Sequence, residues 1–345
     1  MKKILLITEF IDPPYDEGIK KTIYNLFREL DKTYNLKVIC RKGFRKENVY
    51  QVKTNKLFLS TAIRKHIQKF NPYTIIYLPF ASATFASYLR LFILNLYTLN
   101  NKNVFISLQP KPLKSWQRSL VHFMKPKLAA TPSPALYSFW KSLKIRSQLI
   151  PLYTVLEYYR PVNKEQKIFL RKKYNLPEDR IIVSHMGHLN QGRNLESLIP
   201  LQKAGKQVII IGSSSTPEDS IGPASLKQNL ANKGINIIDH YIEKIEEIYQ
   251  LSDAYIFPVV QKNSSIGLPL SILEARACGI PVITTNFGSV SHFLGNDHGN
   301  IYYSNPENFL KALNQLENDN QINRHKTNIH KLNEKFLNYI HNMIN

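Results

Sequence analysis

Residues 264–289 read Ser-Ser-Ile-Gly-Leu-Pro-Leu-Ser-Ile-Leu-Glu-Ala-Arg-Ala-Cys-Gly-Ile-Pro-Val-Ile-Thr-Thr-Asn-Phe-Gly-Ser, and this stretch decides the fold. Pro269 suits the first turn of a helix, because a missing backbone N–H costs little there. Gly279 suits the end of that helix, and residues 282–285 predict a short buried strand. A loop, a short helix with a single acid, Glu274, and a strand in this order are suited to a phosphorylated ligand.

Apolar runs of strand length alternate with helical patterns along most of the chain. Strands are predicted at residues 4–8, 36–40, 49–52, 74–78, 104–108, 129–134 and 148–153, and again at 181–186, 208–211, 235–238, 254–257 and 282–285. Helices are predicted from Lys20 onward and at 61–70, 81–99, 165–174, 245–251 and 271–278, while 109–118 and 212–217 are predicted loops. Because the alternation starts anew near residue 181, we expect an α/β protein of two Rossmann-like, doubly wound domains facing a ligand-binding cleft.

The length of 345 residues is sufficient for two domains. The first domain is predicted at residues 1–160 and the second at 161–305. The sequence Tyr-Tyr-Arg-Pro-Val-Asn at 158–163 has the composition of a linker between them. Residues 306–345 form a polar, helix-patterned segment, and packing of this segment against the first domain is an open alternative.

The positive charge is concentrated in the first half of the chain. The net charge is +21, and residues 1–160 hold 27 Lys and Arg against 8 Asp and Glu. This asymmetry indicates an anionic partner, such as membrane lipid, a lipid-linked phosphate or nucleic acid. A lysine-rich, solvated surface is the alternative. Nucleic acid is disfavoured because no recognised nucleic-acid-binding module is present.

Cysteine usage and hydropathy bear on location. Cys40 and Cys278 are too few and too far apart for a disulfide framework, which favours a reducing, intracellular setting. Residues 85–99 are apolar but short, and a core helix is favoured over a membrane span. We therefore expect a cytoplasmic protein, with peripheral association at the inner face of a membrane as an open alternative.

A second constellation is Gly187-His-Leu-Asn-Gln-Gly-Arg193, which follows a predicted strand and leads toward a predicted helix. The glycines allow close backbone approach, and Arg193 offers a fixed charge with bidentate donors. These features suit a diphosphate, with a solvated Arg193 as the alternative. No histidine pair has metal-binding spacing, and of His185 and His188 we expect one to be buried and one exposed.

A third constellation is the loop at residues 12–21, in which Gly18 precedes a predicted helix. Gly18 would allow a phosphate to approach the helix N-terminus, and Lys20 and Lys21 would add positive charge. The loop lacks a full Gly-x-Gly-x-x-Gly pattern, so a dinucleotide site is not supported. An ordinary turn between strand and helix is the alternative.

Two of these segments resemble the donor-site motifs of GT-B glycosyltransferases, family 4 in particular. That family usually reads Glu-Gly-Phe-Gly-Leu-Pro-x-Leu-Glu-Ala-Met-Ala-Cys-Gly-x-Pro-Val-Ile-Ala-Thr, and residues 273–285 here read Leu-Glu-Ala-Arg-Ala-Cys-Gly-Ile-Pro-Val-Ile-Thr-Thr. It also reads Gly-Arg-Leu-x-x-x-Lys-Gly, where residues 187–194 read Gly-His-Leu-Asn-Gln-Gly-Arg-Asn. The resemblance covers most of residues 165–305 and is only topological over 1–160.

The resemblance implies a retaining glycosyltransferase that takes a nucleotide-sugar donor and needs no bound metal or other cofactor. It assigns the ribose hydroxyls to Glu274, the diphosphate to Arg193 in place of the usual lysine, and the preceding arginine position to His188. Gly18 would lie near the diphosphate or the donor sugar. The sugar itself would contact the backbone of Gly267, Leu268, Pro269 and Leu270. The acceptor implied is a glycan or lipid-linked molecule of cell-envelope polysaccharide or glycoconjugate synthesis.

This chain departs from the family at the first acid of the usual Glu-x7-Glu pair. That position falls at Ile266, or at Ser264 if two residues are inserted, and neither side chain carries charge. No catalytic residue is therefore assigned from the sequence. The alternative function is a catalytically silent, glycosyltransferase-like binding protein or partner subunit.

Overall fold

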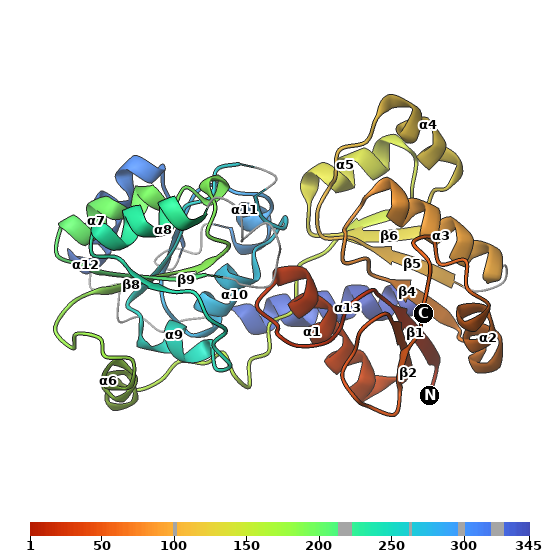
Figure 1. Cartoon of the computed structure of the whole chain (residues 1–345), viewed down its shortest axis with the longest axis horizontal. Helices are drawn as coiled ribbons and strands as arrows, with labels where there is room; N and C mark the ends of the chain where they lie inside the picture. The colour runs from red at the N-terminus through yellow and green to blue at the C-terminus, as the bar shows by residue number, and fades with distance from the viewer. Residues whose placement is uncertain (99–101, 213–222, 262–263, 296–300, 319–327) are drawn as a thin grey trace. The chain divides into compact units, whose positions relative to one another are not determined.

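The computed structural model describes residues 1–98, 102–212, 223–261, 264–295, 301–318 and 328–345. The chain divides into two compact units (Figure 1). Unit 1 consists of Met1–Tyr153 together with Glu334–Asn345, and unit 2 consists of Thr154–Asn333. Each unit is built on a parallel sheet with helices between its strands, so the predicted α/β class with two doubly wound domains is confirmed.

In the described part of unit 1 the sheet has seven strands in the order β3-β2-β1-β4-β5-β6-β7, all parallel. The strands are β1 (Lys3–Ile7), β2 (Asn35–Cys40), β3 (Val49–Gln51), β4 (Thr74–Tyr77), β5 (Lys102–Ile106), β6 (Leu128–Thr131) and β7 (Ser147–Leu149). The chain starts at β1 and the strand order reverses between β1 and β4. Ligands of open parallel sheets bind outside the carboxyl ends of the strands at such a point.

The helices of unit 1 are α1 (Gly18–Thr33), α2 (Thr61–Phe70), α3 (Phe85–Tyr97), α4 (Ser115–Phe123) and α5 (Pro134–Ser142). The last helix of the chain, α13 (Ile329–Ile344), contributes its residues from Glu334 onward to unit 1. Phe336, Ile340 and Ile344 of α13 are buried, and the Thr74 hydroxyl of β4 donates to the Ile344 carbonyl at 3.3 Å. The chain enters unit 2 at Thr154 and leaves it at Asn333.

In the described part of unit 2 the sheet has six strands in the order β10-β9-β8-β11-β12-β13, all parallel. The strands are β8 (Ile182–Gly187), β9 (Gln207–Gly212), β10 (Asn236–Ile238), β11 (Ala254–Phe257), β12 (Val282–Thr284) and β13 (Ile301–Tyr303). The helices are α6 (Lys164–Lys173), α7 (Ile199–Lys203), α8 (Pro223–Asn232), α9 (Glu246–Leu251), α10 (Leu270–Ala277), α11 (Val290–Leu294) and α12 (Phe309–Asn318), with 3-10 turns η1 (Gln191–Arg193), η2 (Leu195–Leu198) and η4 (Pro306–Asn308). Here the order reverses between β8 and β11.

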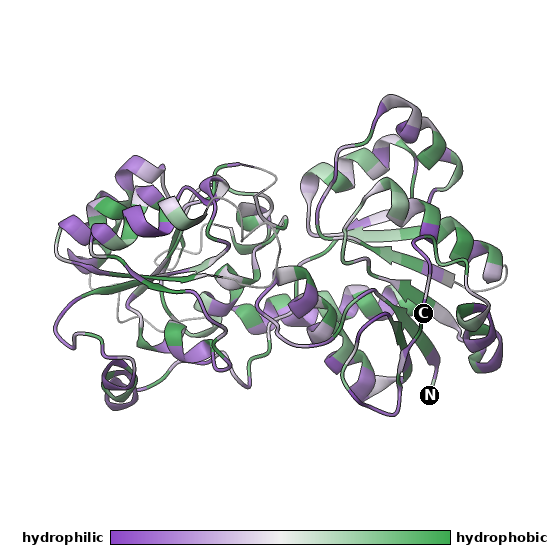
Figure 2. Ribbon diagram, viewed as in Figure 1, coloured by the Kyte–Doolittle hydropathy of each residue, from purple (hydrophilic) through white to green (hydrophobic). Residues whose placement is uncertain are grey.

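The strands of both sheets are apolar along most of their length (Figure 2). Such near-continuous apolar strands are typical of parallel sheets with helices on both faces. Val183, Val208, Ile210 and Ile256 of the unit 2 strands pack in one buried cluster with side chains of the surrounding helices. The core of each unit therefore lies between its sheet and its helices.

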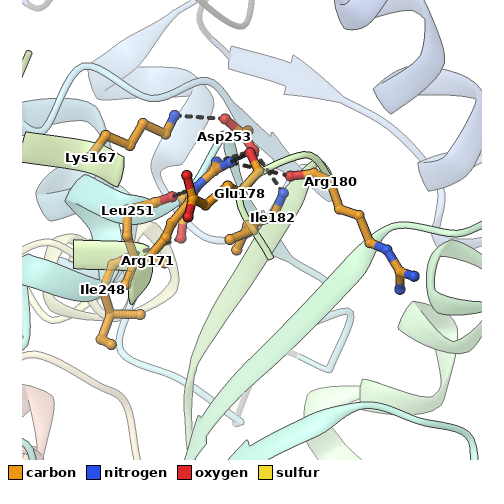
Figure 3. Close-up of polar contacts among 9 residues, drawn as sticks. Lys167, Arg171, Glu178, Arg180, Ile182, Ile248, Leu251 and Asp253 are labelled. Atoms are coloured by element: carbon orange, nitrogen blue, oxygen red, sulfur yellow. Dashed lines mark hydrogen bonds and ion pairs between the residues drawn. The ribbon is translucent and has the colours of Figure 1, made fainter. Parts of the chain in front are cut away.

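A buried ion network ties α6 to the amino ends of β8 and β11 (Figure 3). The Asp253 carboxylate accepts hydrogen bonds from Lys167 Nζ at 2.6 Å, from Arg171 Nη2 at 2.6 Å and from the backbone N–H of Ile182 at 2.7 Å. Since this network lies at the edge opposite the carboxyl ends of the strands, it positions α6 and leaves the ligand edge free for other groups.

The structure corrects several predicted elements. Residues 109–118 are not a loop throughout, because α4 begins at Ser115, where the Gln117 side chain accepts from the Lys114 N–H at 2.8 Å. The predicted strand at 129–134 ends at Thr131, and Pro134 opens α5 instead. After Arg193 the chain forms the 3-10 turn η2 and the five-residue helix α7 in place of one amphipathic helix. The loop predicted at 212–217 lies outside the described residues from 213 onward.

Candidate donor site in unit 2

The two sequence motifs follow the two strands at which the order of the unit 2 sheet reverses. The motif that ends in Arg193 follows β8, and the loop from Ser264 to Pro269 lies between β11 and α10. Because β8 and β11 are adjacent and parallel, both motifs leave the same edge of the sheet. This is the place where doubly wound sheets bind their ligands.

Helix α10 forms as its sequence predicts. Pro269 is the N-cap residue, and Cys278 is the C-cap. Gly279 follows in a left-handed conformation with φ +80°, and its N–H donates to the Arg276 carbonyl at 3.0 Å. Glycine adopts this conformation without steric cost, so it ends the helix and directs the chain toward β12.

Glu274 is buried near the middle of α10, between tyrosines of two other segments. The hydroxyl of Tyr249, on α9, donates to Glu274 Oε2 at 2.9 Å. Tyr159 also hydrogen-bonds the carboxylate, and its ring packs edge-on against Tyr249 at 5.9 Å between centroids. Burial, and then the charge of Glu274, raise the pKa of both tyrosines well above its usual value, so both remain protonated donors. The carboxylate is therefore oriented by two hydroxyl groups.

Tyr255 on β11 connects the Glu274 region with the Arg193 region. Its hydroxyl donates to the Met186 carbonyl at the end of β8 at 3.4 Å. Burial raises the pKa of Tyr255. Among the smaller effects, the positive charge of Arg193 lowers this pKa and the negative charge of Glu274 raises it. Because both charges act on this one hydroxyl, Arg193 and Glu274 both lie in the neighbourhood of Tyr255.

Arg193 is buried, which rules out the solvated alternative. It lies in the turn η1, and a Cβ atom added at Gly187 would approach Arg193 Nη1 to 3.1 Å. Gly187 thus leaves the space that the guanidinium occupies at the end of β8. The guanidinium carbon also lies 6.0 Å from the ring centroid of Phe257, at the end of β11. A guanidinium held in this way is fixed in place before any anion arrives.

His185 lies on β8 beside this guanidinium and is fully buried. Burial, and then the positive charge of Arg193, lower the pKa of His185 to about 3. The ring is therefore neutral, and its Nδ1 donates to the Ile256 carbonyl at 2.9 Å. That assignment leaves Nε2 as an acceptor on the side of Gly187, where an added Cβ would lie 3.4 Å away. Because the His185 ring is neutral, the positive charge at the end of β8 is that of Arg193.

The loops that carry the two motifs contact each other. A Cβ atom at Gly192 would overlap the Ser264 hydroxyl, so Gly192 allows the turn η1 to pack on the start of the second motif. At the other end of that motif, the Ser289 N–H donates to the Gly267 carbonyl at 2.8 Å. Gly288, at φ +58°, packs so closely on Gly267 that no side chain fits between them. The three loops therefore form one assembly.

The position of the missing acid is apolar in the folded protein. Ile266 is buried, and Ser264 is partly exposed with its hydroxyl 3.5 Å from Gln261 Oε1. The next residues, Gly267, Leu268, Pro269 and Leu270, are buried and lead directly into α10. This loop can thus present backbone groups and a helix N-terminus to a ligand, while neither candidate position contributes a carboxylate.

Residues 166–335 match the family described as glycosyl transferases group 1. This part of the chain belongs to that family. The group 1 domain thus comprises nearly all of unit 2, including Glu274, Arg193 and the loops that connect them.

Curated relatives match part of the chain. TuaC of Bacillus subtilis strain 168, named for teichuronic acid biosynthesis, is 26% identical over 180 residues, which cover 50% of this chain and 42% of TuaC. The alpha-galactosylglucosyldiacylglycerol synthase of Streptococcus pneumoniae is 26% identical over 139 residues, covering 39% of this chain and 36% of the synthase. The chain thus matches less than half the length of each of these relatives.

The similarity in structure extends over the whole chain. HepE of Anabaena, solved in complex with UDP-glucose, superposes with a TM-score of 0.75 at 14% identity, covering 99% of this chain and 100% of that chain. The match confirms the predicted GT-B fold, and family 4 stays a prediction.

Two further predicted donor residues are His188 and Gly18. His188 follows β8 and is partly exposed, as expected beside the buried His185. Gly18 belongs to unit 1, where it is the first residue of α1. The side chain of Glu17 accepts from the Lys20 N–H at 2.8 Å, so a carboxylate already caps this helix. The roles of His188 and Gly18 toward a donor stay predictions.

The sequence did not assign three residues that shape the group 1 site. Tyr159 falls in the segment predicted as a linker, which is wrong for this residue because it is buried against Glu274. Tyr249 lies outside the two motifs, and Ser289, the last residue of the second motif, was given no role. A usable signal was the single acid in a mostly apolar helix, since a buried carboxylate requires hydrogen-bond donors from neighbouring segments.

In the part of the chain that the structure describes, no group of three or more His, Cys, Asp or Glu side chains is arranged to hold a metal ion. No helix among the same residues combines the length and the hydropathy needed to cross a bilayer.

Proposed function

We propose that this chain is a glycosyltransferase that moves a sugar from a nucleotide-sugar donor to a glycan or lipid-linked acceptor of the cell envelope. The observation that carries the proposal is that two buried charged side chains, Arg193 and a Glu274 oriented by Tyr249, both lie at the reversal point of the unit 2 sheet. Membership of residues 166–335 in the group 1 family supports the reaction class. The UDP-glucose bound to HepE supports a nucleotide-sugar as the donor.

Each group of the proposed site has a distinct role toward the donor. Glu274 accepts hydrogen bonds from the ribose hydroxyls, while Tyr159 and Tyr249 hold its carboxylate in position. The guanidinium of Arg193 binds the diphosphate through paired N–H donors. The backbone from Gly267 to Leu270 contacts the sugar, and the N-terminus of α10 adds a positive dipole end.

In the proposed reaction the acceptor hydroxyl attacks the anomeric carbon of the sugar with retention of configuration. The bond to the diphosphate breaks, the nucleoside diphosphate leaves with the bonding electrons, and a phosphate oxygen of this leaving group takes the proton of the acceptor hydroxyl. Arg193 and the backbone N–H groups stabilise the negative charge that develops on the leaving oxygen, without a metal cofactor. The names of the curated relatives support an acceptor from envelope polysaccharide or glycolipid synthesis.

The proposal is tested first by donor binding. UDP, UDP-glucose and a panel of other nucleoside diphosphates and their sugars are added to the protein, and the melting temperature is followed. A ligand present at 100 times its dissociation constant stabilises the folded state by roughly 2.7 kcal/mol, which is easily measured. We expect one nucleotide class to raise the melting temperature of the wild type, and Glu274→Ala to lose that shift. Glu165→Ala, an exposed acid on α6, is the matched control and should retain it. The absence of a shift with every nucleotide would contradict the proposal.

A second candidate function is a catalytically silent, glycosyltransferase-like binding protein. Its support is Ile266, a buried apolar side chain at the position where the family usually has an acid. This candidate predicts the same thermal shift but no chemistry. Hydrolysis or transfer of the best-binding nucleotide-sugar by the purified protein alone would exclude it, and nucleotide release only in the presence of a partner subunit would support it.

A further inference from the structure

Helix α4 of unit 1 presents an apolar stripe to solvent. Trp116, Leu120 and Phe123 are 55%, 43% and 77% exposed. Their spacing of four and three residues places them on one face of the helix. Val121, the buried residue of α4, lies on a different face and attaches the helix to the core. The stripe is therefore not a consequence of core packing, and exposed apolar surface of this kind marks an interaction site.

Helix α3 extends this apolar surface. The rings of Phe85 on α3 and Trp116 on α4 meet edge-on with centroids 5.3 Å apart. Phe92 and Leu96 lie further along α3 and are also exposed. Residues 85, 89, 92 and 96 are all apolar and recur at helical spacing, so they follow one face of α3. The two helices lie next to each other in Figure 1, and both carry apolar residues beside polar ones in Figure 2.

Positively charged side chains lie close to the stripe in sequence. Five exposed cations lie on α4 or within a few residues of its ends, namely Lys111, Lys114, Arg118, Lys125 and Lys127. No aspartate or glutamate occurs anywhere between Glu47 and Glu157, whereas fifteen lysines and arginines do. The field around α4 is thus positive, with no acid from this long segment to neutralise it.

Four kinds of occupant can be compared on these observations. A second copy of the chain would bring two equally basic faces together, which like-charge repulsion opposes. Nucleic acid would use the cations and stack on the aromatic rings, but Leu120 and Leu96 would gain nothing from it. A protein partner of acidic character would satisfy the charges without requiring a linear apolar stripe. An anionic bilayer uses both features at once, because apolar side chains enter the acyl boundary while cations lie on the headgroups.

We propose that α4, with the exposed end of α3, docks unit 1 on an anionic lipid bilayer. The stripe of Trp116, Leu120 and Phe123 enters the boundary between headgroups and acyl chains, and the five cations contact lipid phosphates. This names the surface through which the proposed glycosyltransferase would reach a lipid-linked acceptor. The docking itself needs no donor, so vesicle binding and nucleotide binding can succeed or fail separately.

The two tryptophans make docking directly observable. Trp140 is fully buried, where its Nε1 donates to the Tyr88 hydroxyl at 2.8 Å, and Trp116 is exposed on the stripe. A change in tryptophan emission on adding vesicles therefore reports on Trp116. We expect a blue shift with vesicles that contain phosphatidylglycerol, a much smaller one with phosphatidylcholine alone, and protection of Trp116 from a water-soluble quencher. Trp116→Phe should bind but remove the shift.

Variants separate the apolar and the charged contributions, with co-sedimentation as the assay. The double variant Leu120→Ser with Phe123→Ser removes two exposed apolar side chains of the stripe. It leaves the contact between Trp116 and Phe85 intact. Lys114→Gln with Arg118→Gln removes two cations, and a loss of roughly fivefold in affinity is expected for each of them. The matched control is Phe169→Ser with Tyr241→Ser, which removes an exposed pair of unit 2. All variants should keep the wild-type melting temperature.

The proposal is supported if both α4 variants lose vesicle binding, the control retains it, and added salt weakens it. It is overturned if anionic vesicles give neither co-sedimentation nor a blue shift. It is equally overturned if the Leu120 and Phe123 variant binds as the wild type does, since the stripe would then have no role. Dissociation of a dimer by that variant, or tighter binding to an oligonucleotide than to vesicles, would assign the surface to those occupants instead. A nucleotide-induced thermal shift in protein that fails to bind vesicles would leave the glycosyltransferase proposal standing.

Discussion

Glu274 and Arg193 show why burial matters at the scale of single residues. Each is a charged group held almost entirely out of water, and each is oriented by neighbours that come from other segments. Tyr249 directs the carboxylate through a hydrogen bond, while Gly187 and Phe257 define the space of the guanidinium. Groups fixed in advance lose little conformational freedom when a ligand binds, so both are expected to be sensitive to conservative substitution.

Replacement of Arg193 by lysine tests whether the fork of donors matters or only the charge. Lysine keeps the positive charge but cannot offer two parallel N–H donors to a diphosphate. We expect Arg193→Lys to weaken binding of the best nucleoside diphosphate by roughly tenfold and Arg193→Ala to weaken it further, as for other charge-assisted hydrogen bonds. Isothermal titration calorimetry measures this directly. Arg180→Lys, at an exposed position in the same unit, should bind as the wild type does, and equal affinity of Arg193→Lys and wild type would argue against a bidentate contact.

His185 makes stability depend on pH in a defined window. The pKa of His185 is about 3 in the folded protein, against the ordinary histidine value of 6.5 in the unfolded chain. Between these values the unfolded chain binds a proton that the folded chain does not, so stability is lost as the pH falls below 6.5, by about 1.4 kcal/mol per pH unit. Above pH 6.5 the histidine has no effect on this dependence.

His185→Gln is the test of that dependence. Glutamine is polar and offers an amide N–H donor but does not titrate. We expect the melting temperature of the wild type to fall more steeply than that of His185→Gln between about pH 6 and about pH 4, while the two run in parallel above about pH 7. Parallel curves across the acidic range would mean that His185 is accessible to protons in the folded state.

At the scale of loops and helices, the close contact between Gly267 and Gly288 joins two elements of the site. A side chain at 288 would collide with the Gly267 carbonyl, and the positive φ of +58° adds backbone strain. Gly295 has φ +59° but open space around its Cβ position, so Gly295→Ala measures the conformational cost alone, roughly 1–3 kcal/mol. We expect Gly288→Ala to lower the melting temperature clearly more than Gly295→Ala and to weaken nucleotide binding. Similar effects of both variants would show that the loops can separate without loss.

Elements with strong local signals were predicted well from the sequence. The helix of Glu274 was predicted within one residue at each end, because Pro269 and Gly279 mark its limits chemically. Helix α4 was missed for the opposite reason. Its segment is basic, aromatic and interrupted by proline, and its start depends on a side-chain cap by Gln117 that no periodicity reveals.

The site could be predicted only as far as the motifs extend. Glu274 and Arg193 stand in motifs that are contiguous in sequence, so both were found. Their supports were not, since Tyr159 lies 115 positions before Glu274 in the chain and reaches it only through folding. The burial of Arg193 likewise depends on a glycine at the end of a strand and a ring on the neighbouring strand. Contacts of this kind arise from tertiary packing, which local pattern does not encode.

At the scale of the whole molecule, each unit can be tested for its own stability. Ile340 of α13 is buried in unit 1, so Ile340→Ala should destabilise that unit by roughly 2–5 kcal/mol. We expect faster hydrogen exchange in peptides from β1 and β4, with peptides from β8 and β11 unchanged. Glu334→Ala, an exposed residue of the same helix, is the control. Faster exchange in unit 2 to the same extent would mean that the units unfold together.

The path of α13 has a consequence for the order in which the protein is made. A ribosome completes every residue of unit 2 before it adds Glu334–Asn345, the segment that belongs to unit 1. The amino-terminal unit is therefore translated first and finished last. Until α13 emerges, the groups of unit 1 that contact this helix lack their partner. One of them is the Thr74 hydroxyl, which donates a hydrogen bond to the Ile344 carbonyl. The nascent chain must hold an incomplete first unit throughout the synthesis of the second, and that interval is when its apolar surface is most open to chaperones.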